Sequence, residues 1–505
     1  MKRKLLTVLM YVMCVVSIFA QSGTAGDLTW TFNETTGELK VEGKGEMPDY
    51  YNKQPWYDYL SSIKSISIGN EITSIGFGAF SKCSSLTEIN IPNSVNGIGG
   101  SAFSECSSLT TINIPEEVEY VDDRAFNNTP WYDNQPDGII YIGKALYKQK
   151  GHLESQDVEV KPGTVSISFN AFRNNIQLAS ITIPESVVYI AGRAFQDCTS
   201  LTSVILSEGL EGIDDSAFEG CRSLETIILP SSLVYLGNEV FYGCSGLKTV
   251  ILGKSIESID FGAFTGCGSL ESILVDKENL KYTSEGGVLF DKKKEVLSIY
   301  PGGLKGKYTI PNSVKTIGYG AFYASDLTSV IIPNSVTKIE SVAFKYCRSL
   351  TSITIPVSVK SIDSEAFYDC SSLAQVQVNW NKPLSISPEI FNIDMIKKCT
   401  LYVPAGTKSL YEQAKGWLNF GTIIEGEMPT SIDNPETSNN IYISGNTLYT
   451  YTPVSETITI YSVTGELLYT FAKPAGEASF TLNNTKNQML IVRTESGVTK
   501  KLINR

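Results

Sequence analysis

The residues of this chain that are able to do chemistry recur at fixed positions of a repeat. Cysteine follows an Ala-Phe or Val-Phe pair at a 23-residue spacing, as at Cys198, Cys221, Cys244 and Cys267. Nine cysteines remain once residues 1–20 are removed, and eight of them share this position. In a secreted protein such a count first suggests disulfides. The repeated position, which Asn175 also occupies, instead favours buried reduced thiols, with bridges between stacked neighbours as the open alternative.

The remaining reactive side chains, histidine and the carboxylates, give little support for a metal-binding or catalytic site. The chain contains one histidine, His152, which leaves almost nothing for metal sites or catalytic triads that depend on histidine. Its 53 Asp and Glu residues leave a carboxylate-pair hydrolase formally open. Asp214, Asp260 and Asp363 are the tempting carboxylates, but they occupy a turn position where other repeats carry glycine. We therefore expect no enzyme, no catalytic or metal-binding residues and no cofactor.

The repeat itself must position these residues. Leu201-Thr-Ser-Val-Ile-Leu, Leu224-Glu-Thr-Ile-Ile-Leu and Leu247-Lys-Thr-Val-Ile-Leu begin 23 residues apart. Alternation of apolar and polar residues within such a segment is typical of a short strand with one buried face. A fixed period of this length predicts a stacked solenoid, because one unit cannot bury its apolar side without a neighbour. One strand per coil then stacks on the next as a parallel sheet.

The repeat resembles the BspA-like branch of the leucine-rich-repeat family. The segments that carry the resemblance include Gly78-Ala-Phe-Ser-Lys-Cys-Ser-Ser-Leu and Glu365-Ala-Phe-Tyr-Asp-Cys-Ser-Ser-Leu. The resemblance extends over residues 25–425. It implies a mainly β, curved solenoid that binds partners rather than catalysing a reaction. It further implies adhesion to host extracellular-matrix proteins or to other cells, with a protein or a cell-surface glycoprotein as the ligand.

The first 20 residues have the features of a secretory signal. Lys2, Arg3 and Lys4 precede an apolar run from Leu5 to Phe19. A membrane anchor is the competing interpretation, but the run is short for a bilayer span. We therefore expect a secreted or outer-surface protein with no membrane insertion after signal removal, cleaved after Ala20 or Ala25. The acidic composition, with a sequence pI near 4.9, argues against nucleic acid and anionic membranes as partners.

Composition and pattern divide the remaining chain into four parts. Residues 21–62 predict a β-hairpin cap with Trp30, Phe32, Leu39 and Val41 on one face. The solenoid follows over residues 63–426, with hairpin inserts near 127–165 and 276–310 and a short helix over 407–416. The inserts either project from the ligand-binding face or merely widen one coil. Residues 427–440 are a polar linker, and 441–505 predict a small β-sandwich.

The C-terminal region resembles the sorting domain of type IX secretion. Ile458-Thr-Ile-Tyr-Ser-Val-Thr-Gly-Glu-Leu-Leu-Tyr and the Lys-rich Gly497-Val-Thr-Lys-Lys-Leu-Ile carry this resemblance. The segment departs from the family pattern at Asn487-Gln-Met-Leu, where the family has Gly-x-Tyr, and it has no Tyr-Pro-Asn-Pro opening. The resemblance implies a role of this region in export.

The outward position of the repeated strand gives the candidate binding site. It is polar in the first and last coils and apolar in the middle, at Ile205, Ile228, Ile251, Leu274 and Ile331. Exposed side chains of this kind would form an apolar stripe, which on a protein surface marks a partner site. The alternatives are that β-branched residues simply suit strands and that the inserts cover them. The sequence thus predicts a protein-binding adhesin. A structural or self-associating surface component is the alternative, and a glycan-processing enzyme comes third.

Overall fold

The fold is built almost entirely from short strands, and the predicted stack of 23-residue coils is confirmed. The computed structural model describes residues 20–428, 440–444, 447–452, 455–462, 466–474, 476–483, 488–495 and 499–504. The chain divides after Cys267 into two compact units. The signal predicted at 1–20 lies outside the described residues except for Ala20, and so does most of the linker predicted at 427–440.

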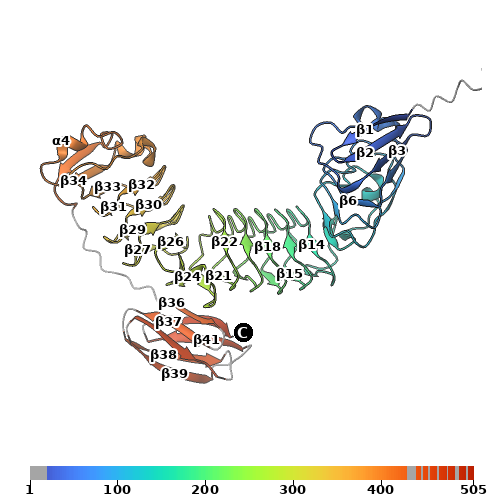
Figure 1. Cartoon of the computed structure of the whole chain (residues 1–505). Coiled ribbons are helices and arrows are strands. Elements are labelled where there is room, and N and C mark those ends of the chain that lie inside the picture. Colours follow the sequence, from blue (N-terminus) through green and yellow to red (C-terminus); the bar gives the residue numbers. More distant parts are fainter. Residues whose placement is uncertain are drawn as a thin grey trace, which may run out of the picture. The chain divides into compact units, whose positions relative to one another are not determined.

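Each regular coil of the first unit supplies two strands rather than one. Figure 1 shows them as two rows, with β14, β18 and β22 in one and β15 and β21 in the other. The longer strands are β7 (Glu88–Asn90), β9 (Thr111–Asn113), β13 (Asp157–Glu159), β15 (Ser180–Ile183), β17 (Ser203–Leu206), β19 (Thr226–Ile228) and β21 (Thr249–Leu252). The short ones are β8 (Gly97–Ile98), β10 (Tyr120–Val121), β14 (Ser166–Ile167), β16 (Tyr189–Ile190), β18 (Gly212–Ile213), β20 (Tyr235–Leu236) and β22 (Ser258–Ile259). The sequence did not predict the second row, because two residues are too few to show alternation.

An antiparallel hairpin begins the first unit. Strands β2 (Leu28–Asn33) and β3 (Glu38–Glu42) pair so that Trp30 opposes Val41 and Phe32 opposes Leu39, as expected, with all four side chains buried. β1 (Ala20–Ala25) pairs with β2, and β5 (Ser65–Ile68) pairs in parallel with β3. β4 (Lys44–Glu46) and β6 (Glu71–Ile75) extend the short-strand row, and the 3-10 helix η1 spans Tyr57–Ser62. Parallel pairing thus passes from the hairpin directly into the coils.

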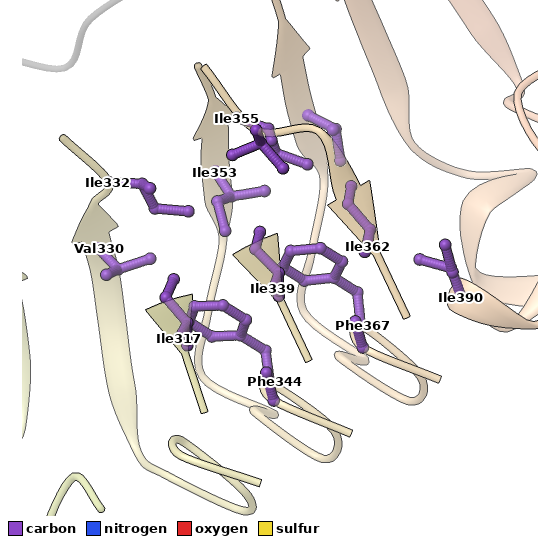
Figure 2. Close-up of a cluster of buried hydrophobic side chains, with 14 of the residues drawn as sticks. Ile317, Val330, Ile332, Ile339, Phe344, Ile353, Ile355, Ile362, Phe367 and Ile390 are labelled. Carbon is purple, nitrogen blue, oxygen red and sulfur yellow. The ribbon is translucent and has the colours of Figure 1, made fainter. Parts of the chain in front are cut away.

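A ladder of phenylalanine rings forms the core of the coils. In the first unit Phe195 and Phe218 stack with centroids 4.9 Å apart, and Phe218 and Phe241 with centroids 5.5 Å apart. Figure 2 shows the same arrangement in the second unit, where the rings of Phe344 and Phe367 lie parallel at 5.1 Å. Trp56 stacks on Phe80 at 5.6 Å and closes the ladder of the first unit. Trp56 of the Pro-Trp-Tyr-Asp segment at 55–58 is fully buried and therefore belongs to the core.

The repeated cysteines are free thiols, and most of them donate to a backbone carbonyl group of the preceding coil. All nine described cysteines are free and buried. The Cys221 thiol donates to the carbonyl oxygen of Phe195 in the preceding coil at 3.2 Å, and Cys244 does the same to Phe218 at 3.0 Å. Asn175 occupies the same repeat position but bonds differently, because its Oδ1 accepts from the main-chain N–H groups of Gln177 and Leu178. Eight of the nine described thiols satisfy a buried carbonyl group in this way and join two successive coils.

Burial of these thiols predicts a loss of stability at alkaline pH. Burial raises the pKa of Cys198 from an ordinary value of 9.0 to about 12. The unfolded chain loses this proton near pH 9 while the folded chain retains it, so stability falls as pH rises from about 9 to about 12. We expect the urea midpoint to decline over this range and to decline less steeply in Cys198→Ala. Equal slopes for the two proteins would contradict this cause.

Both inserts contain hairpins that become part of a sheet. β11 (Gly138–Ile142) and β12 (Ala145–Lys150) pair antiparallel, and β12 then pairs in parallel with β14. In the second unit β24 (Tyr282–Glu285), β25 (Val288–Asp291) and β26 (Val296–Ile299) pair antiparallel in order, and β26 pairs with β28 (Thr316–Ile317). The short helix α2 (Pro130–Asp133) lies in the first insert, capped by the Thr129 side chain. Each insert thus starts a row of short parallel strands, which supports the interpretation that it widens a coil.

The second unit repeats the two-row arrangement. Its longer strands are β23 (Ser272–Val275), β27 (Gly306–Thr309), β29 (Leu327–Ile331), β31 (Ser352–Ile355), β33 (Gln375–Val378), β34 (Thr400–Val403) and β35 (Thr422–Glu425). Its short strands continue from β28 to β30 (Lys338–Ile339) and β32 (Ser361–Ile362). The remaining helices are η2 (Pro388–Ile390), α3 (Ile393–Ile396) and α4 (Lys408–Tyr411). The helix predicted over 407–416 is therefore a single turn, and its Thr407 makes no side-chain cap to it.

Residues from Asn440 onward form two antiparallel sheets. One has the order β36 (Asn440–Ser444), β37 (Thr447–Thr452), β40 (Gly476–Thr481). The other has the order β39 (Leu467–Lys473), β38 (Glu456–Ser462), β41 (Gln488–Thr494), β42 (Thr499–Asn504). Ile441 and Leu448 of the first sheet belong to the same buried cluster as Ile458 and Ile460 of the second. The region thus has an apolar core of its own, separate from the phenylalanine ladder.

Candidate functional site

In the first unit the predicted stripe lies on the outer face of the longer strands. Ile205 is 53% exposed, while Ile228 and Ile251 are half-buried. Ile228 and Ile251 are direct register partners in β19 and β21, and Thr182 of β15 pairs with Ile205 of β17. The inward neighbours on these strands, such as Val204 and Ile227, are buried. Because successive side chains of a strand point to opposite faces, the three isoleucines share one side of the row.

In the second unit the prediction for Leu274 is wrong. Its side chain is 6% exposed, and its strand β23 lies against β24 and β25 of the second insert. The Ile273 N–H donates to the Gly287 carbonyl oxygen at 2.9 Å, which fixes the hairpin on this strand. The insert therefore covers the position that the repeat pattern assigns to the surface. Alternation along one strand could not reveal this, because the covering residues come from another segment of the chain.

Ile331 is exposed but isolated. Its exposed fraction is 47%, and its register partners on either side are Thr309 and Thr354. Threonine also stands at one end of the row of the first unit, at Thr182. The stripe is thus reduced to Ile205, Ile228 and Ile251 in the first unit, with one separate isoleucine in the second. We call these three isoleucines the isoleucine row.

Polar side chains form ladders where the outward position is not apolar. The Asn113 side-chain amide donates to Oδ1 of Asn90 in the coil before it. These residues are register partners in β7 and β9. A polar ladder of this kind stays hydrated and gives little apolar area to a partner. Of the outward positions of the first unit, the isoleucine row is therefore the part suited to a partner's apolar residues.

The candidate carboxylates have structural roles. Asp260 accepts from the Tyr235 hydroxyl at 3.0 Å and from the Ser258 hydroxyl at 3.2 Å. The main-chain N–H of Asp363 donates to the Ile339 carbonyl oxygen of the preceding coil at 2.9 Å. Asp363 also lies 3.4 Å from the Lys338 ammonium group. These contacts fit the turn role that the sequence assigns to these positions.

Two further features bear on the kind of site the chain holds. Within the part of the chain that the structure describes, no three His, Cys, Asp or Glu side chains come together as a set of metal ligands. None of the helices in the described segments has the length and apolar character that a membrane span requires.

Sequence reasoning missed the outward row of the short strands. Tyr120, Tyr189 and Tyr235 are the first residues of β10, β16 and β20, and each precedes a buried Val, Ile or Leu. Tyr120 is 45% exposed, and the hydroxyl of Tyr235 reaches the carboxylate of Asp260. The available signal was the recurrence of tyrosine two residues before an acidic or small residue at the turn position. This recurrence becomes meaningful only when the tyrosine and the apolar residue that follows it are recognised as a two-residue strand.

Known repeat proteins match this architecture. The sequence pattern described as BspA type leucine rich repeat region (6 copies) matches residues 54–161, 165–286 and 305–414, more than half of the chain. The chain belongs to the BspA-type leucine-rich repeat family. These matches extend from the end of the N-terminal hairpin region to α4, and the C-terminal sheets lie beyond them. No curated protein matches the chain.

Solved structures with the same kind of fold come from several bacteria. A leucine-rich repeat protein from Eubacterium ventriosum is 20% identical over 80% of this chain and 85% of that chain, with a TM-score of 0.34. The pneumococcal vaccine antigen PcpA is 18% identical over 81% of this chain and 99% of that chain, with a TM-score of 0.38. A leucine-rich repeat protein from Bacteroides ovatus is 21% identical over 79% and 98%, with a TM-score of 0.36.

Proposed function

We propose that this protein of the BspA-type leucine-rich repeat family is secreted or displayed on the outer cell surface and binds a macromolecular partner there. It acts as an adhesin for host matrix proteins or for other cells. The signal over residues 1–20 starts its export, and residues 441–505 serve its sorting. Membership of the BspA-type leucine-rich repeat family accords with a surface location.

The observation that carries this proposal is the isoleucine row. Three isoleucines stand on consecutive coils, each fixed by parallel pairing and by the buried ladder beneath it. A rigid row of this kind loses little conformational entropy when a partner covers it. Buried apolar anchors with few competing polar groups are the usual centre of a protein interface.

The test compares the protein, residues 21–505, with the triple variant Ile205→Ser, Ile228→Ser and Ile251→Ser. We expect binding to a matrix protein or to cells to weaken about 100-fold, because each of the three truncated anchors costs about fivefold. Thermal unfolding should stay unchanged, since the serine side chains replace the outward isoleucines only. Surface-immobilised matrix proteins and whole cells form the binding panel.

Ile331→Ser provides the matched control, because it makes the same change at the same repeat position where the isoleucine is isolated. We expect this variant to bind like the parent protein. If the triple variant also binds like the parent, the isoleucine row is not the site. If the parent binds nothing on the panel, the adhesin proposal fails.

A structural, self-associating role is the second candidate, and one observation favours it. β35 ends the sheet β27-β29-β31-β33-β34-β35, and no described strand pairs with its other edge. Ile424 on this strand is 42% exposed, and Leu418 just before it is 47% exposed. An edge with exposed apolar residues is a template for pairing with another chain. Sedimentation at several protein concentrations separates the candidates, since self-association makes the apparent mass rise with concentration.

A further inference from the structure

An acidic groove lies on the short-strand face of the first unit, away from the isoleucine row. It encloses about 680 Å³ and is bordered by strands β4, β6, β8, β10, β14 and β16. Its polar lining includes the carboxylates of Glu46, Asp49, Asp122 and Asp214. No lysine, arginine or histidine belongs to the residues that line it. The groove is therefore a concave surface of one charge sign, which concentrates ligands of the opposite sign.

The negative charges of the groove oppose one another. The Asp122 side chain is exposed to the groove, yet the surrounding protein desolvates its carboxylate and raises its pKa. A hydrogen bond from the Asp123 N–H counters part of this effect, while the charges of Asp123 and Asp49 add to it. Asp123 itself is neutralised by Lys148 at 3.2 Å, and no such ion pair is formed by Asp122 within the described residues. A bound cation would relieve this repulsion.

Tyrosine rings supply the apolar part of the groove. Tyr120 of β10 is 45% exposed, and Tyr189 of β16 is half-buried; both line the groove. Burial and a hydrogen bond with Asp214 raise the pKa of Tyr189, so this hydroxyl stays protonated. Gly212 of β18 leaves room for this contact, since a Cβ there would lie 3.1 Å from the Tyr189 ring. Aromatic faces next to carboxylates are a usual setting for lysine and arginine side chains.

A buried hydroxyl at the border of the groove has no partner. Ser168 follows β14, lines the groove and is 3% exposed. Its Oγ makes no hydrogen bond to the protein. A buried polar atom without a partner costs free energy, and a ligand that offers a hydrogen bond removes that cost. This observation is independent of the acidic charge and points to an occupant of the groove.

The positive groups nearest to the groove do not fill it. The Arg193 guanidinium lies over the ring of Phe169, 5.7 Å from its centroid, and the Arg193 side chain is exposed. Lys144 is paired with Glu119 at 3.0 Å, outside the lining residues. Phe169 lines the groove, so Arg193 lies at its border. Within the described residues none of the four carboxylates forms an ion pair, while Asp49 accepts from the Phe77 N–H at 2.6 Å and from the Tyr51 hydroxyl at 3.2 Å.

We propose that this groove binds lysine and arginine side chains of a basic segment of a partner polypeptide. The charged ends contact the carboxylates of Asp49, Asp122 and Asp214, and their apolar stems lie against Tyr120 and Tyr189. The volume accommodates side chains from a short extended segment. This site does not depend on the isoleucine row, so either can fail without the other.

The test measures fluorescence polarisation of a short labelled peptide of alternating glycine and arginine with the whole protein. Matched peptides of glycine and glutamate, and of glycine and serine, serve as probes of charge. We expect binding of the arginine peptide only, and weaker binding as salt rises from about 50 to about 200 mM. Binding should also weaken as pH falls through the raised pKa of Asp122, because protonation removes its charge.

Substitutions locate the site. Asp122→Asn with Asp214→Asn keeps the size of both side chains, and we expect it to weaken peptide binding at least about tenfold, the effect of losing one charge-assisted hydrogen bond. Tyr120→Leu should weaken it about threefold through the lost ring face. The matched control is Asp260→Asn with Glu257→Gln. It removes the same charge at the far end of the same sheet, where Tyr235 and Asp260 repeat the pairing of Tyr189 and Asp214.

Three outcomes would overturn the proposal. The arginine peptide could bind no better than the serine peptide, which would exclude recognition of charge. The groove variant could bind like the control variant, which would place the binding elsewhere on this acidic protein. A labelled neutral oligosaccharide could bind in place of the peptide, which would assign the groove to another ligand class. Thermal unfolding of the groove variant, expected to be unchanged or raised because repulsion is removed, shows that loss of binding is not loss of fold.

Discussion

Replacing Phe218 by alanine is expected to lower the free energy of unfolding of the first unit by about 3–5 kcal/mol, as for other fully buried phenylalanines. Phe218 has no exposed surface, and its ring stacks on Phe195 at 4.9 Å and on Phe241 at 5.5 Å. Its main chain is equally engaged, because the N–H donates to Val240 and the carbonyl oxygen accepts the Cys244 thiol. Those two bonds hold the following coil, and the bonds of Ala217 and Cys221 to Phe195 hold the preceding one, so the coils cannot collapse into the space that the ring leaves.

Urea unfolding of the parent and of Phe218→Ala measures the effect. In a stacked repeat each coil is stabilised mainly by its neighbours, so a cavity in one coil weakens the contacts on both sides. Phe261→Ala is the control, because this phenylalanine of the same unit is 37% exposed and should cost less than about 1 kcal/mol. Equal losses for the two variants would show that the ring ladder does not determine stability.

Gly421→Ala is expected to destabilise the second unit by about 3 kcal/mol, the upper end of the range for overpacking. A Cβ at this position would lie 1.9 Å from the carbonyl oxygen of Lys397, and 2.7 Å from its carbonyl carbon. These are main-chain atoms, which cannot rotate away as a side chain would. The Gly421 N–H donates to Ile396 at 3.0 Å and leads into β35, so the added methyl group displaces this strand or the turn after α3.

Gly268→Ala is the matched control for this change. Gly268 is also exposed, but no atom lies within 4 Å of the position of its added Cβ. Alanine there restricts the unfolded chain and should stabilise the protein slightly, by about 0.4–1 kcal/mol. Thermal unfolding of the two variants should therefore shift in opposite directions. If Gly421→Ala unfolds at the same temperature as the parent, the turn after α3 can move to accommodate the methyl group at little cost, and the prediction is wrong.

The local pattern predicted much of the fold. The 23-residue recurrence of Leu, Phe and Cys predicts the stack, because every coil must bury the same apolar side chains and does so against its neighbours. The hairpin of Trp30, Phe32, Leu39 and Val41 followed from alternation, and β25 and β26 pair within the hairpin insert that the sequence predicts near 276–310. The coils that depart from the repeat pattern could not be predicted in this way. Phe391 stacks on Phe367 at 5.4 Å although its surroundings have drifted from the repeat.

The candidate sites show where such prediction ends. The sequence by itself determined which strand residues alternate, and hence that Ile205, Ile228 and Ile251 share one face. Only the tertiary structure decided which of the outward positions stay accessible, since the hairpin that buries Leu274 arrives from a different part of the chain. The acidic groove depends on the same kind of contact, because Asp49 and Asp214 are 165 residues apart and border one cavity. Periodicity records the neighbours along a strand, whereas accessibility and charge clustering depend on segments that only folding brings together.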